Sequence, residues 1–297
     1  MSDAAISVES SGRFALGRWR VHRAGFGAMQ LAGDGVFGPP RDRDEALAVL
    51  RQAVADGVDH IDTAHYYGPG VVNELIREAL HPYPGGLAIV SKVAARRDET
   101  GAVLPYDEPD QLRRGIEDNL ATLGIDRLAA VNLRLADRSE PDRRFESQLA
   151  AMIHARDEGL IDGIGLSNIT RDHLLRAAAI TEIVCVQNLF NLTDRRSLAL
   201  LRACRQRQIA FVPYCPLGWP RAERDRILRH PRVVAIAARH GATPAQVALA
   251  WLLGLAPHVL LIPGTRTRAH LAENLGAGSV ELDSEATREL TEQLLQE

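Results

Sequence analysis

The stretch DTAHYYG, residues 62–68, decides the fold expected for this chain. It follows a short segment, 58–61, that we expect to be a buried strand, and it precedes a run with helical spacing of apolar residues from Val71 onward. A strand, a loop and a helix in that order form the repeating unit of α/β proteins. In a closed barrel of such units the chemistry lies where the strands end, so Asp62 and Tyr67 are the first candidate functional residues.

The next expected strand supplies a third candidate. The run LAIVSKV, residues 87–93, is apolar until it reaches Ser91 and Lys92, which places an ammonium group near the strand end. We expect Lys92 to stand beside Asp62 and Tyr67 on one rim of the barrel. An adjacent ammonium group stabilises phenolate, so Lys92 is expected to lower the pKa of Tyr67 from its ordinary value of ~10, while Asp62 holds Lys92 in place.

The alternation of strands and helices continues along the chain, and eight strand–helix units can be counted. This count predicts a (β/α)8 TIM barrel, for which 297 residues are sufficient. The expected strands are 25–30, 58–61, 87–92, 129–133, 161–166, 183–186, 209–212 and 259–262. The expected helices begin near residues 42, 71, 108, 145, 170, 193, 243 and 267.

Other segments are expected outside the eight units. Residues 1–13 are expected to be a disordered tail, and 14–297 a single barrel domain. Residues 14–21 read as a β-hairpin, and 233–240 and 284–295 as additional helices towards the C-terminus.

Several helix ends carry recognisable signals. Asp42, followed three residues later by Glu45, predicts a capping pair at the first helix. Thr243 and Pro244 predict the start of another helix, and Thr193 is the expected cap of the sixth. The glycines at 25 and 27 do not form a dinucleotide fingerprint, because the third glycine is absent and no helix follows at once.

Composition limits the function classes. The net charge of -3 and a pI near 6.4 provide no basic field for nucleic acid or anionic lipid. The three cysteines lack metal-ligand spacing and suit a reducing compartment, so we expect no metal site. The N-terminus lacks the basic start and apolar core of a signal peptide, and the expected location is the cytoplasm.

Six motifs in one order resemble the aldo-keto reductase family. They are DTAHYYG (62–68), SKV (91–93), GLSN (165–168), VQN (186–188), PYCPLG (213–218) and IPGTRTRAHLAEN (262–274). Together they extend over almost the whole chain, from about residue 14 to 290. The resemblance implies a (β/α)8 barrel that binds NADPH without a Rossmann domain and reduces an aldehyde or ketone.

The resemblance also implies roles for individual residues. Tyr67, directly before Gly68, would be the general acid that protonates the carbonyl oxygen, with Lys92 and Asp62 tuning it. Ser167, Asn168 and Gln187 would hold the nicotinamide carboxamide, and Tyr214 would stack on the ring. The full set of implied cofactor residues is Ser167, Asn168, Gln187, Tyr214, Pro216, Leu217, Gly264, Thr265, Arg266, Arg268, His270, Glu273 and Asn274.

The sequence departs from the family pattern at the phosphate end of this site. Many members carry lysine where Gly264 stands and arginine where His270 stands, and both serve the 2′-phosphate of NADPH. Arg266 and Arg268 could replace that charge, because guanidinium groups bind phosphate through two parallel hydrogen bonds. Glu273 is expected near the adenine together with Asn274.

A second departure lies at the end of the fourth strand, where the family usually has histidine and this chain has Arg134. Its guanidinium could donate to a substrate carbonyl and attract an acidic group on the same molecule. Alternatively, Arg134 pairs only with Asp137 or another acid. In that case the protein would be an NADP(H)-binding sensor or partner protein with little turnover. The natural substrate and the oligomeric state remain open at this level.

Overall fold

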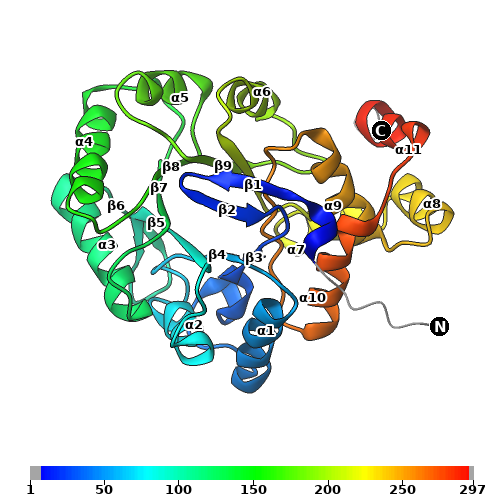
Figure 1. Ribbon diagram of the computed structural model, residues 1–297, viewed down its shortest axis with the longest axis horizontal. Coiled ribbons are helices and arrows are strands. Elements are labelled where there is room, and N and C mark those ends of the chain that lie inside the picture. The colour runs from blue at the N-terminus through cyan, green and yellow to red at the C-terminus, as the bar shows by residue number, and fades with distance from the viewer. Residues whose placement is uncertain (1–7, 294–297) are drawn as a thin grey trace.

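The computed structural model describes residues 8–293 and confirms the predicted (β/α)8 barrel. Within these residues, parallel strands pair with one another in chain order at the centre of the molecule, and helices surround them (Figure 1). The parallel strands are β3 (Phe26–Gly27), β4 (His60–Asp62), β5 (Ala88–Arg97), β7 (Ala130–Arg134), β8 (Ile164–Ser167), β9 (Cys185–Leu189) and β10 (Ala210–Tyr214).

The segment predicted as the eighth strand closes the barrel. Its Leu260 N–H donates to Phe211 O over 2.9 Å, on the side of β10. On the other side Leu261 N–H donates to Arg23 O over 2.7 Å, and Gly25 N–H donates to Leu261 O over 2.8 Å. These contacts are isolated bridges rather than a continuous ladder, so the last strand is a short seam.

Helices follow the strands near the predicted places, except that α6 begins later than expected. Thr243 caps its helix with the expected box, and Gly124 ends α3 in the left-handed conformation. The barrel helices are α1 (Arg43–Ala55), α2 (Val71–Leu80), α3 (Pro109–Leu123), α4 (Arg143–Asp157), α5 (Arg171–Ala178), α6 (Leu198–Gln206), α9 (Pro244–Leu255) and α10 (Arg268–Leu275).

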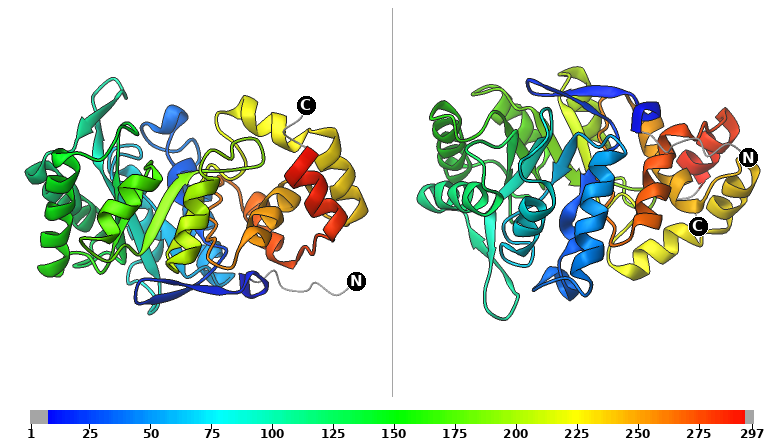
Figure 2. Two further views of the ribbon diagram at one scale, coloured as in Figure 1. Left: turned by 90° about the horizontal axis from the view of Figure 1, so that it is seen from above. Right: turned by 60° about the horizontal axis from the view of Figure 1, so that its bottom comes forward.

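Additional elements lie at the floor and on one side of the barrel. The predicted hairpin is present, and α7, α8 and the C-terminal turns gather on one side (Figure 2). The elements are β1 (Arg13–Leu16), β2 (Trp19–His22), β6 (Val103–Tyr106), α7 (Arg221–Leu228), α8 (Pro231–Arg239), α11 (Ser284–Arg288), the π-helix Glu289–Gln293 and the short 3-10 helices Val8–Ser11, Ala28–Leu31, Asp34–Val36 and Gly276–Ser279.

Part of the expected N-terminal tail has a defined structure. Val8–Ser11 form a 3-10 turn, in which Val8 is fully buried. The Ser11 hydroxyl accepts from the Ala24 N–H over 3.1 Å, which ties this turn to the barrel. The prediction of disorder was therefore wrong for residues 8–13, while 1–7 and the expected last helical turn beyond 293 lie outside the described residues.

Three local expectations were also wrong. Thr193 does not cap α6, whose preceding residue is Ser197, because the Asn191 side chain instead accepts from the Thr193 N–H in a turn. Lys92 lies inside β5 rather than at its end, since the strand continues and pairs with β6 in an antiparallel hairpin. Helix α7 was not predicted, because its sequence lacks a clear apolar period and only Ile227 is buried.

The hairpin decides which end of the barrel is open. Leu16 and Val21 of the hairpin are buried against the first residues of several strands, among them Ala88 of β5 and Ala130 of β7. The hairpin therefore covers the end at which the strands begin. The opposite end, where Asp62 and Arg134 stand, is left for the functional site.

Two glycines allow the first and last strands to approach at the seam. A Cβ atom on Gly27 would lie 2.4 Å from Ile262 O, and one on Gly264 would lie 2.4 Å from Gly27 O. Both distances are far below van der Waals contact with backbone atoms that cannot move alone. The seam therefore requires residues without a side chain at both positions.

We predict that Gly264→Ala lowers the free energy of unfolding by about 1–3 kcal/mol, because the new methyl group must displace the seam backbone. Equilibrium urea unfolding measures this change. Gly254→Ala is the matched control, since this exposed glycine in α9 has nothing within 4 Å of a Cβ atom. The control should gain about 0.5–1 kcal/mol from helix propensity, and an equal gain at Gly264 would contradict the close approach.

Candidate active site

The Asp62 carboxylate joins three strands inside the barrel. Lys92 Nζ of β5 lies 2.5 Å from Asp62 Oδ1, and Gln187 Nε2 of β9 donates to Asp62 Oδ2 over 2.7 Å. All three residues are at most 4% exposed. A charge buried to this extent is stable only when it is paired and hydrogen-bonded, so each partner depends on the other two.

A polar network behind the ion pair fixes its position. Lys92 also donates to the Thr63 carbonyl over 2.9 Å, and the Thr63 hydroxyl donates to Asn73 Oδ1 of α2 over 2.8 Å. Asn73 in turn donates to Asn119 of α3 over 3.0 Å, and Ser91 donates to the same oxygen over 2.5 Å. Because both asparagines are fully buried, the helices hold the strand ends through side chains that have no access to water.

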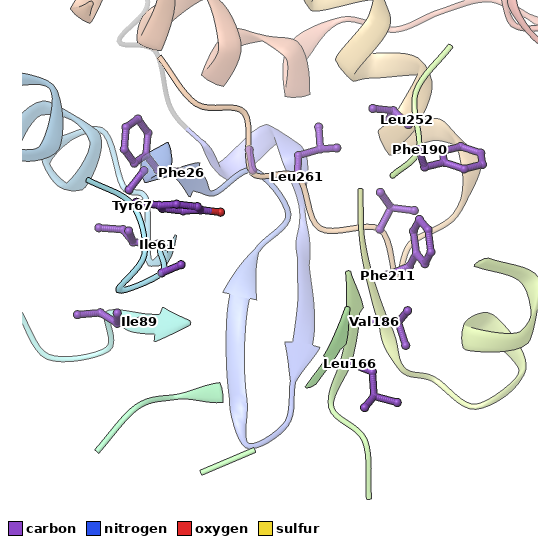
Figure 3. Packing of buried hydrophobic residues seen from close by; sticks show 14 of the residues in the cluster. Phe26, Ile61, Tyr67, Ile89, Leu166, Val186, Phe190, Phe211, Leu252 and Leu261 are labelled. Atoms are coloured by element: carbon purple, nitrogen blue, oxygen red, sulfur yellow. The ribbon is translucent and has the colours of Figure 1, made fainter. Parts of the chain in front are cut away.

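Tyr67 lies on the turn that follows β4. Its ring makes an edge contact with Tyr66 at 5.2 Å between centroids, and Lys92 Nζ lies 5.0 Å from the centre of the Tyr67 ring. Figure 3 shows this ring near Phe26 with its hydroxyl oxygen directed towards the middle of the barrel. Among residues 8–293 no group hydrogen-bonds to that hydroxyl, and Tyr67 keeps 7% of its surface exposed.

The direction of the Tyr67 pKa differs from the expectation. Burial, followed by the negative charge of Asp62, raises the pKa of Tyr67 well above its usual value. Arg134 opposes this rise without reversing it. The expected lowering by Lys92 is wrong, because burial is the largest cause of the shift and the Asp62 carboxylate adds to it. Tyr67 is therefore a neutral phenol, which is the proton-donating form.

Arg134 reaches the same site from the end of β7. Its positive charge acts on the phenols of Tyr67 and Tyr214, and it is partly exposed. No ion pair of Arg134 exists within the described part of the chain. Asp137, its expected partner in the alternative interpretation, accepts from the Ser139 N–H over 2.9 Å instead. That alternative pairing is therefore wrong, and the guanidinium is available to a ligand.

Arg138 is a second arginine at this strand end, and sequence reasoning missed it. Its Nε donates to Asn168 Oδ1 over 2.9 Å, while Asn168 Nδ2 donates to Leu135 O over 2.8 Å. It also lowers the pKa of Tyr214, although burial raises that pKa overall. The signal that could have identified Arg138 was its position four residues after Arg134, in the loop that follows the same strand.

The residues expected at the nicotinamide lie on three neighbouring strands, β8, β9 and β10, and in the loop after β10. Ser167 is buried at the end of β8, and Tyr214 ends β10. Pro216 and Leu217 follow in the next loop, where Leu217 packs against the core. Gln187 is the clearest fit to the cofactor, because its buried Oε1 has no partner among the described residues and can accept from the carboxamide amino group.

The residues expected at the phosphate gather at the start of α10. The Thr267 side chain caps this helix by accepting from the His270 N–H over 3.3 Å, and Thr265 is buried beside it. Arg266 and Arg268 are both exposed here. Gly264 lies at the seam with the first strand, where a Cβ atom would lie 2.4 Å from Gly27 O. This gives a physical reason why position 264 does not carry lysine. The remaining expected residues on α10 are partly buried Glu273 and buried Asn274.

Comparison with known proteins shows the family of the chain. A model of the aldo/keto reductase family matches residues 23–294. The chain belongs to the aldo-keto reductase family. It is 48% identical to pyridoxine 4-dehydrogenase of Escherichia coli over 93% of this chain and 96% of that protein.

Solved aldo-keto reductases share the fold. A thermostable aldo-keto reductase crystallised with the inhibitor epalrestat has a TM-score of 0.78 and 32% identity, and the match covers 94% of this chain and 98% of the other. An aldo-keto reductase of Klebsiella pneumoniae in complex with NADPH has a TM-score of 0.78 and 26% identity, with 95% of each chain covered. Within residues 8–293, this aldo-keto reductase has no helix of the length and apolarity that a membrane crossing requires.

The Tyr67 environment of this aldo-keto reductase can be measured directly. We predict that no phenolate forms at Tyr67 below about pH 10, because burial and Asp62 both disfavour the charged form. The measurement is the difference in phenolate absorbance between the wild type and Tyr67→Phe across a pH titration. A phenolate signal near neutral pH that disappears in Tyr67→Phe would restore the original expectation.

Proposed function

We propose that this aldo-keto reductase interconverts pyridoxal and pyridoxine with NADPH, and that Tyr67 is its general acid. The observation that carries the proposal is the neutral Tyr67 phenol, whose hydroxyl is directed into the barrel and, like the guanidinium of Arg134, has no partner among residues 8–293. The substrate class follows from the 48% identity to pyridoxine 4-dehydrogenase.

The proton step assigns one task to each side chain. During reduction the Tyr67 hydroxyl donates its proton to the aldehyde oxygen, and the hydride to the carbon would come from NADPH held by Gln187 and its neighbours. The Asp62–Lys92 pair keeps the ring of Tyr67 in place through the contact of Lys92 with its face. In the oxidative direction Tyr67 must act as a phenolate that accepts a proton from the alcohol. The raised pKa of the phenol makes that phenolate a stronger base.

Pyridoxal fits the replacement of the usual histidine by arginine. Its aldehyde at ring position 4 is adjacent to a hydroxyl at position 3, which ionises readily in this heterocycle. Arg134 can pair with that oxygen and donate to the neighbouring carbonyl at the same time, because a guanidinium presents several donors in one plane. A permanent charge at position 134 therefore favours an aldehyde that carries an adjacent anionic oxygen.

We predict that Tyr67→Phe lowers kcat for pyridoxal reduction at least ~10²-fold, because the proton donor is lost. NADPH affinity, measured by fluorescence quenching, should remain within about twofold of the wild type. Turnover that survives in Tyr67→Phe would assign the acid to another group. NADPH binding by the wild type without oxidation of NADPH across a broad carbonyl panel would favour the sensor interpretation instead.

We predict that Arg134→Met lowers kcat/KM for pyridoxal about 10- to 100-fold, the usual effect of losing a hydrogen bond to a charged group. The matched substrate is pyridine-4-carbaldehyde, which has the same aldehyde and ring nitrogen but no 3-hydroxyl. Its kcat/KM should fall clearly less than that of pyridoxal, because it loses only the hydrogen bond to the carbonyl and not the contact with the 3-oxygen. Equal losses for both aldehydes would show that Arg134 does not recognise the 3-oxygen.

A further inference from the structure

Helices α1 and α10 are neighbours on the barrel surface, and an open groove of about 610 Å³ lies between them. One wall carries acidic and amide side chains from α1 and its C-cap residue, and the other carries the start of α10. The groove is lined by Glu45, Gln52, Asp56, Thr267, Arg268, Ala269 and Ala272. The expected 2′-phosphate site of NADPH therefore borders an acidic helix face.

Glu45 crosses from α1 to the first residue of α10. Its Oε1 accepts from the Arg268 main-chain N–H over 3.0 Å, and its Oε2 lies 3.1 Å from the Arg268 guanidinium. The hydrogen bond from that main-chain N–H is the largest cause of a lowered pKa for Glu45. Glu45 is thus a carboxylate at neutral pH, bound to both donor groups of Arg268.

The local sequence predicts a different role for this side chain. Asp42 accepts from the Glu45 N–H over 2.9 Å, which is one half of the expected capping pair. The other half is not formed, because the Glu45 carboxylate lies on Arg268 instead of the N-cap of its own helix. The carboxylate therefore satisfies a free N–H group of another helix.

The donors that Glu45 occupies are those that a phosphate uses at a helix start, namely a main-chain N–H and a guanidinium group. Arg266 differs, because its Nε donates to Gln30 O over 2.8 Å and its NH1 lies 3.6 Å from Asp34. Arg266 thus ties the turn after the seam to the loop after β3. Arg268 is the better phosphate ligand of the two.

We propose that Glu45 sets coenzyme preference by competing with the 2′-phosphate of NADPH for Arg268. The inference rests on the proposed use of NADPH and identifies a residue that weakens NADPH binding. The phosphate must displace the carboxylate from the main-chain N–H and tolerate its negative charge nearby. NADH has a hydroxyl at this position and meets neither cost, so Glu45 narrows the difference in affinity between the two coenzymes.

The test is the affinity of the full-length protein for NADPH and NADH, measured by fluorescence quenching. We expect Glu45→Gln to tighten NADPH binding about 3- to 10-fold and to leave NADH within about twofold. Binding of 2′,5′-ADP should improve in parallel, and binding of 5′-AMP should not. Arg268→Ala should weaken NADPH binding, and the effect of Glu45→Gln should be smaller when added to it, because the competition for the guanidinium is then gone while the main-chain N–H remains.

The matched control is Glu146→Gln. Glu146 of α4 pairs with Arg176 of α5 in the same type of exposed helix–helix contact, with side chains 37% and 57% exposed against 25% and 59% for Glu45 and Arg268. It should not alter either affinity. Unchanged NADPH binding in Glu45→Gln, or equal changes for NADPH and NADH, would overturn the role of Glu45 alone. A wild type that binds neither coenzyme would overturn the proposed function itself.

Discussion

The buried contact of Asp62 with Lys92 and Gln187 is the interaction on which the site depends. It joins β4, β5 and β9, which are not all neighbours in the sheet, so it fixes side chains across the barrel interior. The same carboxylate acts on Tyr67. Burial, and after it the negative charge of Asp62, raises the pKa of Tyr67, so the phenol keeps its proton while Lys92 lies over the ring face.

The sequence predicted much of the barrel because periodicity and capping are local properties. The caps at Asp42 and Thr243 and the left-handed Gly124 lie where the residue types require them. The direction in which the Tyr67 pKa shifts could not be predicted in the same way. It depends on how fully several segments exclude water from one hydroxyl, and that quantity exists only after the barrel has formed.

The misses have related physical causes. Thr193 was a reasonable cap by residue type, but the Asn191 side chain accepts from the Thr193 N–H in a turn. Helix α6 therefore begins later, at Leu198. Glu45 fits the capping-box spacing, yet a partner from a distant part of the chain offers it two donors. Arg138 gave no motif signal, and its contact with Asn168 depends on how two loops meet. In each case a tertiary contact replaced the local one.

The glycine seam restricts the routes by which this sequence can change. A lysine at position 264 would bring charge to the coenzyme phosphate, but its Cβ atom would collide with Gly27 O. The substitution becomes tolerable only after the backbone near Gly27 has moved, and such a movement brings no benefit while Gly264 remains. Adaptation of the expected coenzyme site is therefore directed away from the strand end and towards surface positions of α1 and α10, such as the exposed Arg268.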